Sequence, residues 1–303
     1  MQALLDHERA LLAYRGYLPR FSSRREARSP VEVATHYNLP WKLFETALGG
    51  AGYSAVRHRF QPNCRDAASD RHNELLVSEA LPSGGHLLDL GCGWGGGLLD
   101  VALESESRSV TAITISPSQA EAVRQRFVRE VDSQRLQLKI GDFTDIQSLP
   151  DHVDAITMIE SIEHVGSVRR AAFLAELHER YPNARLVLQV TARAGKGAEG
   201  RSRERGALVD LIFPGPGALP TVSRLRREVS AAGFDIVDLK DLSSEYVVTA
   251  LQWMHGFRAA AERYQELGRI GRLFEAYAAA TAASLDRGLA RNVLLVGVGR
   301  EHA

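Results

Sequence analysis

The chain has 303 residues, 45% of them apolar and 24% charged, and its 37 lysines and arginines balance 37 aspartates and glutamates. These totals fit one large or two small globular domains, and a neutral chain argues against nucleic acid as the main partner. Cys64 and Cys92 do not have the spacing of a metal site or a disulfide framework, and the first residues are unlike a signal peptide. No run approaches the roughly 18 apolar residues that span a bilayer. We therefore expect a cytoplasmic protein with no metal and no stable membrane insertion.

In chain order, the sequence predicts an amphipathic helix over residues 1–30 and an irregular, aromatic-rich segment over 31–65, which together form an amino-terminal cap. From 66 to 303, helical and apolar strand patterns alternate, as in an α/β domain with a parallel sheet covered on both faces. The predicted strands cover residues 86–91, 109–115, 136–142, 153–160, 184–191, 234–240 and 292–299. A loop-like stretch at 192–217 and two helices at 243–287 interrupt the alternation, and we expect them to be inserted elements that cover a site.

The first predicted strand runs into "LLDLGCGWGGGLLD" at 87–100, which is typical of a nucleotide-binding turn. Ligands of open α/β sheets lie at the carboxyl ends of the strands, and glycines there let the backbone approach a ligand closely. "GCGWGG" also matches the dinucleotide motif, but that motif requires an acid about 20 residues further on. The second strand ends instead in "TISPSQ", with Thr114 at that place.

A different nucleotide, S-adenosylmethionine (SAM), fits better. Asp89 precedes the glycines and creates the D-x-G-x-G-x-G pattern of a SAM loop, in which the acid pairs with the ammonium of the methionine moiety. "GDF" closes the third strand, so that Asp142 can accept a hydrogen bond from the adenine and Phe143 can lie against its face. The alternative for Asp142 and Phe143 is a helix cap followed by a core aromatic residue.

From residue 31 to the carboxyl terminus, these motifs in their order resemble the cyclopropane fatty acid synthase and mycolic acid methyltransferase family. The resemblance rests on "HYNLPWKLFE", "GYS", "LLDLGCGWGG", "VTAITISPSQ", "GDF", "IEHVG", "IFPGPGALPTV" and "EYVVTALQW". It implies a seven-stranded, Rossmann-like class I SAM-dependent methyltransferase sheet with an amino-terminal helical segment and a helical lid. It also implies a set of SAM contacts: Tyr37, Tyr53 and Ser54 from above, Asp89, Gly91 and Gly93 at the methionine, Thr114 and Gln119 at the ribose, and Asp142 and Phe143 at the adenine.

Enzymes of this family transfer the SAM methyl group to an alkene carbon, and loss of a proton from the resulting carbocation gives a cyclopropane or a methylated alkene. In the fatty acid synthases the base is a bicarbonate ion held by a Cys, a Glu, a His and a Tyr. Here Glu163 and Tyr246 match, but the Cys position is Ala55 and the His position falls at Gln189 or Val190. This departure disfavours bicarbonate and ring closure.

"IESIEHVG" places Glu160 three residues before Glu163 and resembles the same loop in tocopherol and prenyl diphosphate methyltransferases, where a Glu acts as base. Glu160 is therefore the predicted base, with Glu163, His164 and Tyr246 as further catalytic candidates. The alternatives are an acid placed at a helix amino terminus for Glu160 and a satisfied, partly buried histidine for His164. Two further sets of residues have both a binding and a structural interpretation. The first set either binds a diphosphate or carboxylate or forms a solvated loop: Arg193, Lys196, Arg201, Arg203 and Arg205. The second set either lines the substrate cavity under the lid or only packs the lid: Trp41, Trp253 and Phe257.

The leading hypothesis is a SAM-dependent C-methyltransferase of an apolar acceptor, such as a prenyl diphosphate or a lipid-like specialised metabolite. The alternatives are an O- or N-methyltransferase of a small natural product, with Glu160 or His164 as base, and a cyclopropane-forming fatty acyl synthase. A SAM-binding protein without catalytic activity belongs to another class, which the intact SAM motif disfavours. The oligomeric state, including a homo-oligomer, is left open by the sequence.

Overall fold

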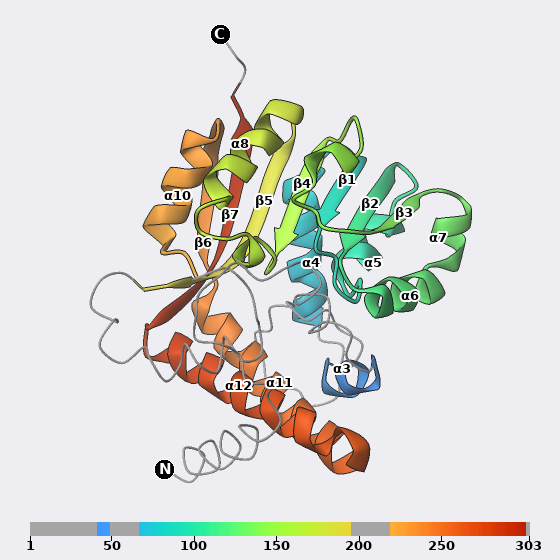
Figure 1. Ribbon diagram of the computed structural model, residues 1–303, viewed down its shortest axis with the longest axis vertical. Helices are drawn as coiled ribbons and strands as arrows, with labels where there is room; N and C mark the ends of the chain where they lie inside the picture. Colours follow the sequence, from blue (N-terminus) through green and yellow to red (C-terminus); the bar gives the residue numbers. More distant parts are fainter. Residues whose placement is uncertain (1–40, 49–66, 195–218, 301–303) are drawn as a thin grey trace.

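The computed structural model of the protein describes residues 41–48, 67–194 and 219–300 (Figure 1). Its centre is a seven-stranded sheet with the order β3-β2-β1-β4-β5-β7-β6. The strands are β1 (Gly85–Leu90), β2 (Arg108–Thr114), β3 (Leu136–Ile140), β4 (Ala155–Ile159), β5 (Arg185–Arg193), β6 (Phe234–Asp241) and β7 (Ala290–Gly299). β1 to β5 run parallel, and β7 is antiparallel to β5 and β6. The predicted fold class and all seven predicted strands are confirmed, each strand within two residues of its predicted bounds.

Helices cover both faces of the sheet, as the continuous apolar strands predict. Alternate side chains of β1 belong to different cores, since Leu87 packs on one face and Leu88 on the other. The first face is covered by α4 (Ala67–Ala80), α5 (Leu98–Glu104) and α6 (Pro117–Arg126), and the second by α8 (Arg170–Arg180) and α10 (Val222–Ala231). Short elements complete this part: α7 (Val128–Asp132), η1 (Ile146–Ser148) and η2 (Ile162–His164).

A helical layer lies at the end of the sheet to which β4 points (Figure 1). It contains α11 (Ser243–Arg263), α12 (Gly268–Asp286), the turn η4 (Gln265–Leu267) between them, and α3 (Trp41–Leu48). Phe44 of α3 packs edge-on against Phe257 of α11 and Phe274 of α12, with ring centroids 6.0 and 5.5 Å apart. Gly256 permits this contact, because a Cβ there would lie 2.1 Å from the Ala47 carbonyl oxygen. The two helices predicted over 243–287 are confirmed.

Two sequence predictions need correction, and others lie outside the described residues. The segment 31–65 is not wholly irregular, because "WKLFETAL" forms α3, in which Leu43, Phe44, Ala47 and Leu48 are buried on one side. The insert predicted from residue 192 starts later, because β5 continues to Arg193 as it pairs with β7. The helix predicted at 1–30 and most of 192–217 are outside the described residues, and the domain division at 65/66 stays a prediction.

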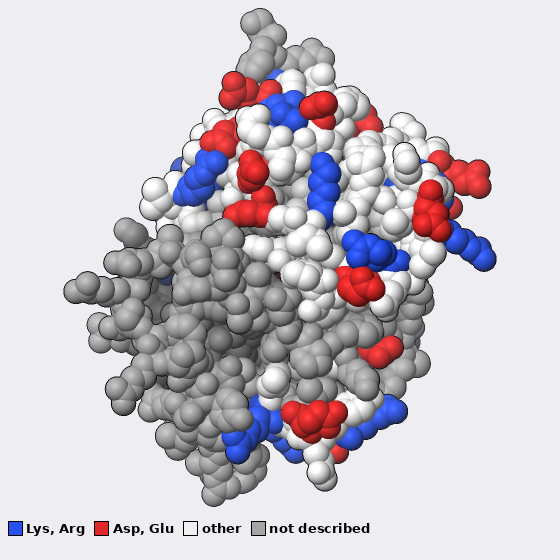
Figure 2. All heavy atoms as spheres, turned by 45° about the vertical axis from the view of Figure 1, so that its right-hand side comes forward, with Lys and Arg blue, Asp and Glu red and all other residues white. Residues whose placement is uncertain are grey.

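Charges are mixed on the surface. Blue and red side chains are interspersed over the described part of the face in Figure 2. Among the described helices, none combines the length and the apolar character needed to cross a lipid bilayer.

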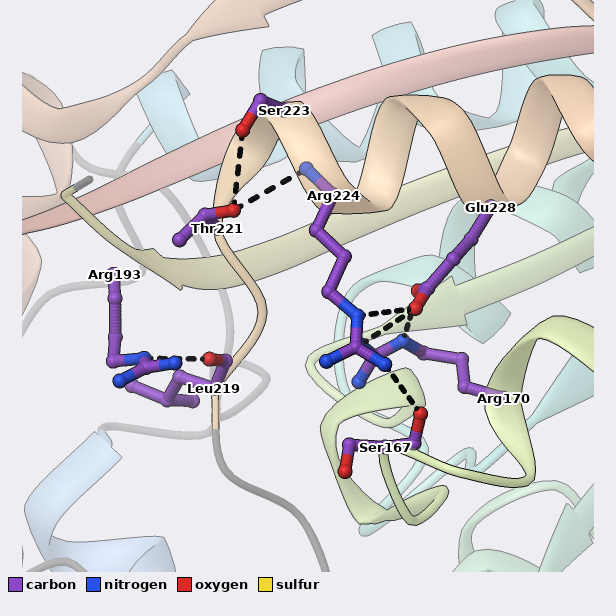
Figure 3. Close-up of polar contacts among 8 residues, drawn as sticks. All are labelled: Ser167, Arg170, Arg193, Leu219, Thr221, Ser223, Arg224 and Glu228. Carbon is purple, nitrogen blue, oxygen red and sulfur yellow. Dashed lines mark hydrogen bonds and ion pairs between the residues drawn. The ribbon is translucent and has the colours of Figure 1, made fainter. Parts of the chain in front are cut away.

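On the second face of the sheet, a buried ion pair joins α8 to α10 (Figure 3). Arg170 is fully buried and donates through Nε to Glu228 at 2.6 Å. Arg224 donates to the same carboxylate at 2.7 Å and to the Ser167 carbonyl oxygen at 2.7 Å. The buried guanidinium is thus matched by a carboxylate, which is the condition for burying a charge without a large cost.

Candidate active site

The glycine loop follows β1 and lies between the carboxyl ends of β1, β2 and β4. The amides of Gly91 and Cys92 donate to the Ile113 carbonyl oxygen at 3.0 and 2.9 Å, which fastens the loop to β2. Gly91 and Gly93 have φ values of 98° and 54°, a region that favours glycine. A Cβ on Gly91 would lie 2.6 Å from Cβ of Ser161, whereas one on Gly93 would meet no atom of the described residues within 4 Å. Gly91 is therefore required by packing, and the described residues leave space beside Gly93, as a cofactor cradle requires.

Asp89 lies at the carboxyl end of β1 and is 3% exposed. Its Oδ1 accepts a hydrogen bond from the Thr157 hydroxyl at 2.9 Å. Burial raises the pKa of Asp89 from 3.8 to about 7, and the hydrogen bond from Thr157 opposes that rise. A desolvated carboxylate with one hydroxyl partner fits the ammonium group of SAM, because a cation would compensate the buried charge.

The predicted ribose and adenine contacts lie at the ends of the next two strands. The Thr114 hydroxyl donates to Oε1 of Gln119 at 2.6 Å, and both side chains are buried. Asp142 accepts hydrogen bonds from the amide and hydroxyl of Thr144 at 2.9 and 2.8 Å, which is a local turn contact and not the helix cap considered as its alternative, because the next helix, η1, has Asp145 as its N-cap. Phe143 packs on Phe173 of α8, with ring centroids 5.8 Å apart. The structure thus places these residues beside the glycine loop and gives Asp142 and Phe143 their structural contacts as well.

Glu160 follows β4 and has an unusual backbone. Its φ is 54°, which costs a residue other than glycine on the order of 1–3 kcal/mol. Its amide donates to the Gln189 carbonyl oxygen at 2.8 Å. Its carboxylate accepts at Oε2 from the Thr191 hydroxyl at 2.9 Å and at Oε1 from Nδ2 of Asn292 at 2.5 Å. Backbone strain that is held by surrounding contacts is found preferentially at functional positions.

Glu163 in η2 is a second carboxylate near Glu160. It is 9% exposed, and its Oε1 accepts from the Thr191 amide at 2.7 Å. Its Oε2 is buried without a hydrogen-bond partner among the described residues. Burial raises the pKa of Glu163 well above its usual value and the charge of Glu160 raises it further, while the pKa of Glu160 is raised by burial against the hydrogen bonds it accepts. Because the pKa of Glu163 is raised further than that of Glu160, Glu160 is the carboxyl of the pair that ionises first.

The other catalytic candidates flank this pair. His164 follows Glu163 directly, and burial lowers its pKa to about 4, so its imidazole is neutral at physiological pH. Tyr246 is 2% exposed in α11 and packs edge-on against Trp253 at 5.6 Å between ring centroids. Tyr277 of α12 is a further titratable group here: burial raises its pKa, and the charges of Glu160 and Glu163 raise it further.

Sequence reasoning missed Thr157, Thr191, Asn292 and His72. One signal was available for Thr191, because it follows Gln189 by two residues in "LVLQVTA" and a strand places such residues on the same face. The same alternation distinguishes Gln189 from Val190 as the residue at the position of the family's bicarbonate-binding His. Gln189 is fully buried and contacts His72 Nε2 at 2.8 Å through its Oε1, whereas Val190 packs in the core of the opposite face.

Gln189 therefore stands where the fatty acid synthases have the His that binds bicarbonate. With this ligand missing, the residues described here do not fit a bicarbonate ion. Ala55, at the Cys position, lies outside the described residues, as do the predicted SAM contacts Tyr37, Tyr53 and Ser54. Within the described residues, no three His, Cys, Asp or Glu side chains form a group that could bind a metal ion.

The predicted arginine-rich insert and the lid residues are described only in part. Arg193 donates through Nε to the Leu219 carbonyl oxygen at 2.9 Å, which ties the end of β5 to the segment before α10 (Figure 3). Lys196, Arg201, Arg203 and Arg205 lie outside the described residues. Trp253 and Phe257 are 2% and 0% exposed and pack within the core, which agrees with the packing interpretation.

Comparisons with known proteins identify the family. A family model described as mycolic acid cyclopropane synthetase matches residues 24–293. A probable fatty acid methyltransferase of Pseudomonas putida is 30% identical over 266 residues, which span 84% of this chain but only 66% of that protein. A methoxy mycolic acid synthase of Mycobacterium tuberculosis is 29% identical over 257 residues, 80% of this chain and 85% of that one.

Two solved structures share the fold. A cyclopropane synthase from Mycobacterium tuberculosis has a TM-score of 0.76 and 19% identity, covering 90% of this chain and 99% of that one. A geranyl diphosphate methyltransferase in complex with geranyl diphosphate and sinefungin has a TM-score of 0.68 and 17% identity, covering 89% and 99%. At these identities the likeness establishes the class I methyltransferase fold.

Proposed function

The chain belongs to the mycolic acid cyclopropane synthetase family of SAM-dependent methyltransferases, and on that premise we propose that it methylates an alkene carbon of an apolar, lipid-like or prenyl acceptor, with Glu160 as the base. The names of its relatives support a lipid-like acceptor, since they include a fatty acid methyltransferase and a methoxy mycolic acid synthase. The likeness in fold to a geranyl diphosphate methyltransferase supports a prenyl acceptor as the second class.

In this proposal, the residues around the glycine loop hold the cofactor. Asp89 pairs with the ammonium group, and the open space beside Gly93 takes the methionine moiety. Thr114 with Gln119 serves the ribose, and Asp142 with Phe143 serves the adenine. Tyr37, Tyr53 and Ser54 stay predicted contacts from the family resemblance. Bound SAM would supply an electrophilic methyl group to this site.

The π electrons of the acceptor form a carbon–carbon bond to that methyl group as its bond to sulfur breaks, which leaves a positive charge on the adjacent carbon. Glu160 stabilises this charge and then takes a proton from a neighbouring carbon, whose C–H electrons form the new double bond. The products are a methylated alkene, S-adenosylhomocysteine and a protonated carboxyl. The observation that carries the proposal is the environment of Glu160: its backbone is strained, and two donors hold its carboxylate near Glu163.

A cyclopropane product is the second candidate, because a cyclopropane mycolic acid synthase of Mycobacterium tuberculosis is 29% identical over 241 residues. It requires loss of the proton from the newly added methyl group instead of from a neighbouring carbon. Gln189 at the position of the family's bicarbonate-binding His disfavours bicarbonate as the base. This product would therefore also need a carboxylate of the chain as base.

The proposal is tested with SAM carrying a CD₃ group and two acceptors, a phospholipid with a cis-unsaturated acyl chain and geranyl diphosphate. Mass spectrometry and NMR of the product then distinguish the reactions. Three deuterons on a carbon indicate a methylated alkene, and two indicate a cyclopropane. A label on oxygen or nitrogen would contradict the proposal and favour a heteroatom methyltransferase.

The role of Glu160 is tested by Glu160→Gln, which keeps the shape and removes the charge. We expect kcat to fall by about 10²–10³-fold, with SAM affinity by calorimetry nearly unchanged. Glu163→Gln should cost less, and Glu176→Gln, at an exposed glutamate in α8, is the matched control. If Glu160→Gln turns over like the control, the carbocation mechanism loses its base.

A further inference from the structure

Two residues on neighbouring strands converge on Glu160. Thr191 in β5 and Asn292 in β7 are directly opposite each other in the antiparallel register. Each donates to a different oxygen of Glu160, at 2.9 and 2.5 Å. Nδ2 of Asn292 also donates to the Thr191 hydroxyl at 3.2 Å, which is possible because an amide carries two N–H donors.

This arrangement determines where the protons point. A hydroxyl that accepts a hydrogen bond from Asn292 is free to direct its own proton at Glu160, so the carboxylate faces a donor at each oxygen. Donors favour the charged form of an acid that accepts from them. The backbone amide of Thr191 donates to Glu163, so the same residue also sets the relative position of the two carboxylates.

Asn292 is itself held firmly. Its side chain is fully buried, its backbone amide donates to the Ser243 hydroxyl at 3.1 Å, and its backbone carbonyl oxygen accepts from the Leu242 amide at 2.8 Å. Ser243 is the first residue of α11, the helix that carries Tyr246. Asn292 therefore connects the helical layer over the sheet to the predicted base.

We propose that Asn292 is a positioning residue that acts through Glu160: it keeps the carboxylate of Glu160 ionised and oriented, directly and through the Thr191 hydroxyl, so that Glu160 ionises before Glu163. This rests on the proposed function, in which Glu160 is the base. Among the described residues, the titratable groups that interact with Glu160 are Glu163 of η2 and Tyr277 of α12, while β5 and β7 present Thr191 and Asn292, which are neutral donors. Glu163 is thus the group that competes with Glu160 for the proton.

The test follows the protonation of Glu160 directly, without an acceptor substrate. The full chain is labelled with glutamate enriched in ¹³C at the carboxyl carbon and titrated by NMR. The signals that disappear in Glu160→Gln and Glu163→Gln assign the pair. We expect Asn292→Leu and Thr191→Val to raise the titration midpoint of Glu160 by about 1–2 pH units, the effect of losing one hydrogen bond to a charged group.

Two matched variants separate positioning from general loss of structure. Thr191→Ser keeps the hydroxyl and should leave the midpoint where it is in the parent, and Asn183→Leu changes an exposed asparagine in the turn before β5 and should have no effect. Circular dichroism checks the fold of each variant, and if Asn292→Leu does not fold, Asn292→Ala and the Thr191 pair decide the question.

An unchanged midpoint in folded Asn292 and Thr191→Val variants would overturn the inference. That outcome is distinct from failure of the proposed function. If Glu160→Gln keeps full turnover, the proposed base is wrong whatever the titration shows. If Glu160→Gln is inactive and the midpoint does not move, only the role of Asn292 is wrong.

Discussion

Replacing Asp89 by asparagine should stabilise the SAM-free protein at alkaline pH, with a smaller gain in acid. Burial raises the pKa of Asp89 from 3.8 to about 7. The folded protein therefore keeps a proton on Asp89 that the unfolded chain releases above about pH 4, and stability falls as the pH rises from about 4 to 7. At about 1.4 kcal/mol for each pKa unit, the ionised carboxylate costs the folded state on the order of 4 kcal/mol above pH 7. Asparagine keeps the shape and an acceptor for Thr157 but carries no charge.

Urea unfolding of the parent and of Asp89→Asn at pH 8 and pH 5 measures this effect, and the gain at pH 5 should be half of that at pH 8 or less. Calorimetry of SAM binding should show the opposite sign, with an affinity about 10–100-fold lower in the variant because a charged hydrogen bond is lost. The affinity of the parent should also decrease as the pH falls below about 7, where Asp89 is protonated. A variant that is less stable at pH 8, or equally affected at both pH values, would refute the desolvation argument. Unchanged SAM affinity would refute the pairing with the ammonium group.

Three further predictions concern the loop, the base and the ion pair. Gly93→Val should abolish SAM binding, measured by calorimetry, because its side chain enters the space beside the loop. Gly93→Ala causes the same backbone strain with a smaller side chain and should retain more binding. Equal SAM binding by both variants and the parent would place the cofactor elsewhere. Turnover in degassed, bicarbonate-free buffer should equal turnover in buffer that contains bicarbonate. A strong loss of turnover that added bicarbonate restores would show that the enzyme uses the ion. Glu228→Gln should lower the free energy of unfolding by about 3–5 kcal/mol, because it leaves the buried Arg170 without a charged partner. The exposed control Glu176→Gln should cost less than about 1 kcal/mol, and equal effects in urea unfolding would contradict this account.

The sequence by itself determined the strands of the sheet and the grouping of Asp89, Gly91 and Gly93. Strands with continuous apolar residues, separated by helical patterns, are typical of a sheet that helices cover on both faces. The seven predicted strands are present, and the first five run parallel. Asp89, Gly91 and Gly93 lie within a few residues of each other on one strand and its turn. Their proximity is a local property of the chain, so a motif is enough to predict it.

The tertiary structure alone decided how the predicted base is held. Thr191 and Asn292 are 101 residues apart and meet only because β7 pairs antiparallel with β5. The sequence left Gln189 and Val190 as equal candidates for one position, and the face of the folded strand separates them. The same holds for Arg170 and Glu228, whose charges are tolerated in the core only because α8 and α10 bring them together. Local patterns follow from the chain's own geometry, whereas the partner of a buried polar group is set by which distant strands and helices pack against it.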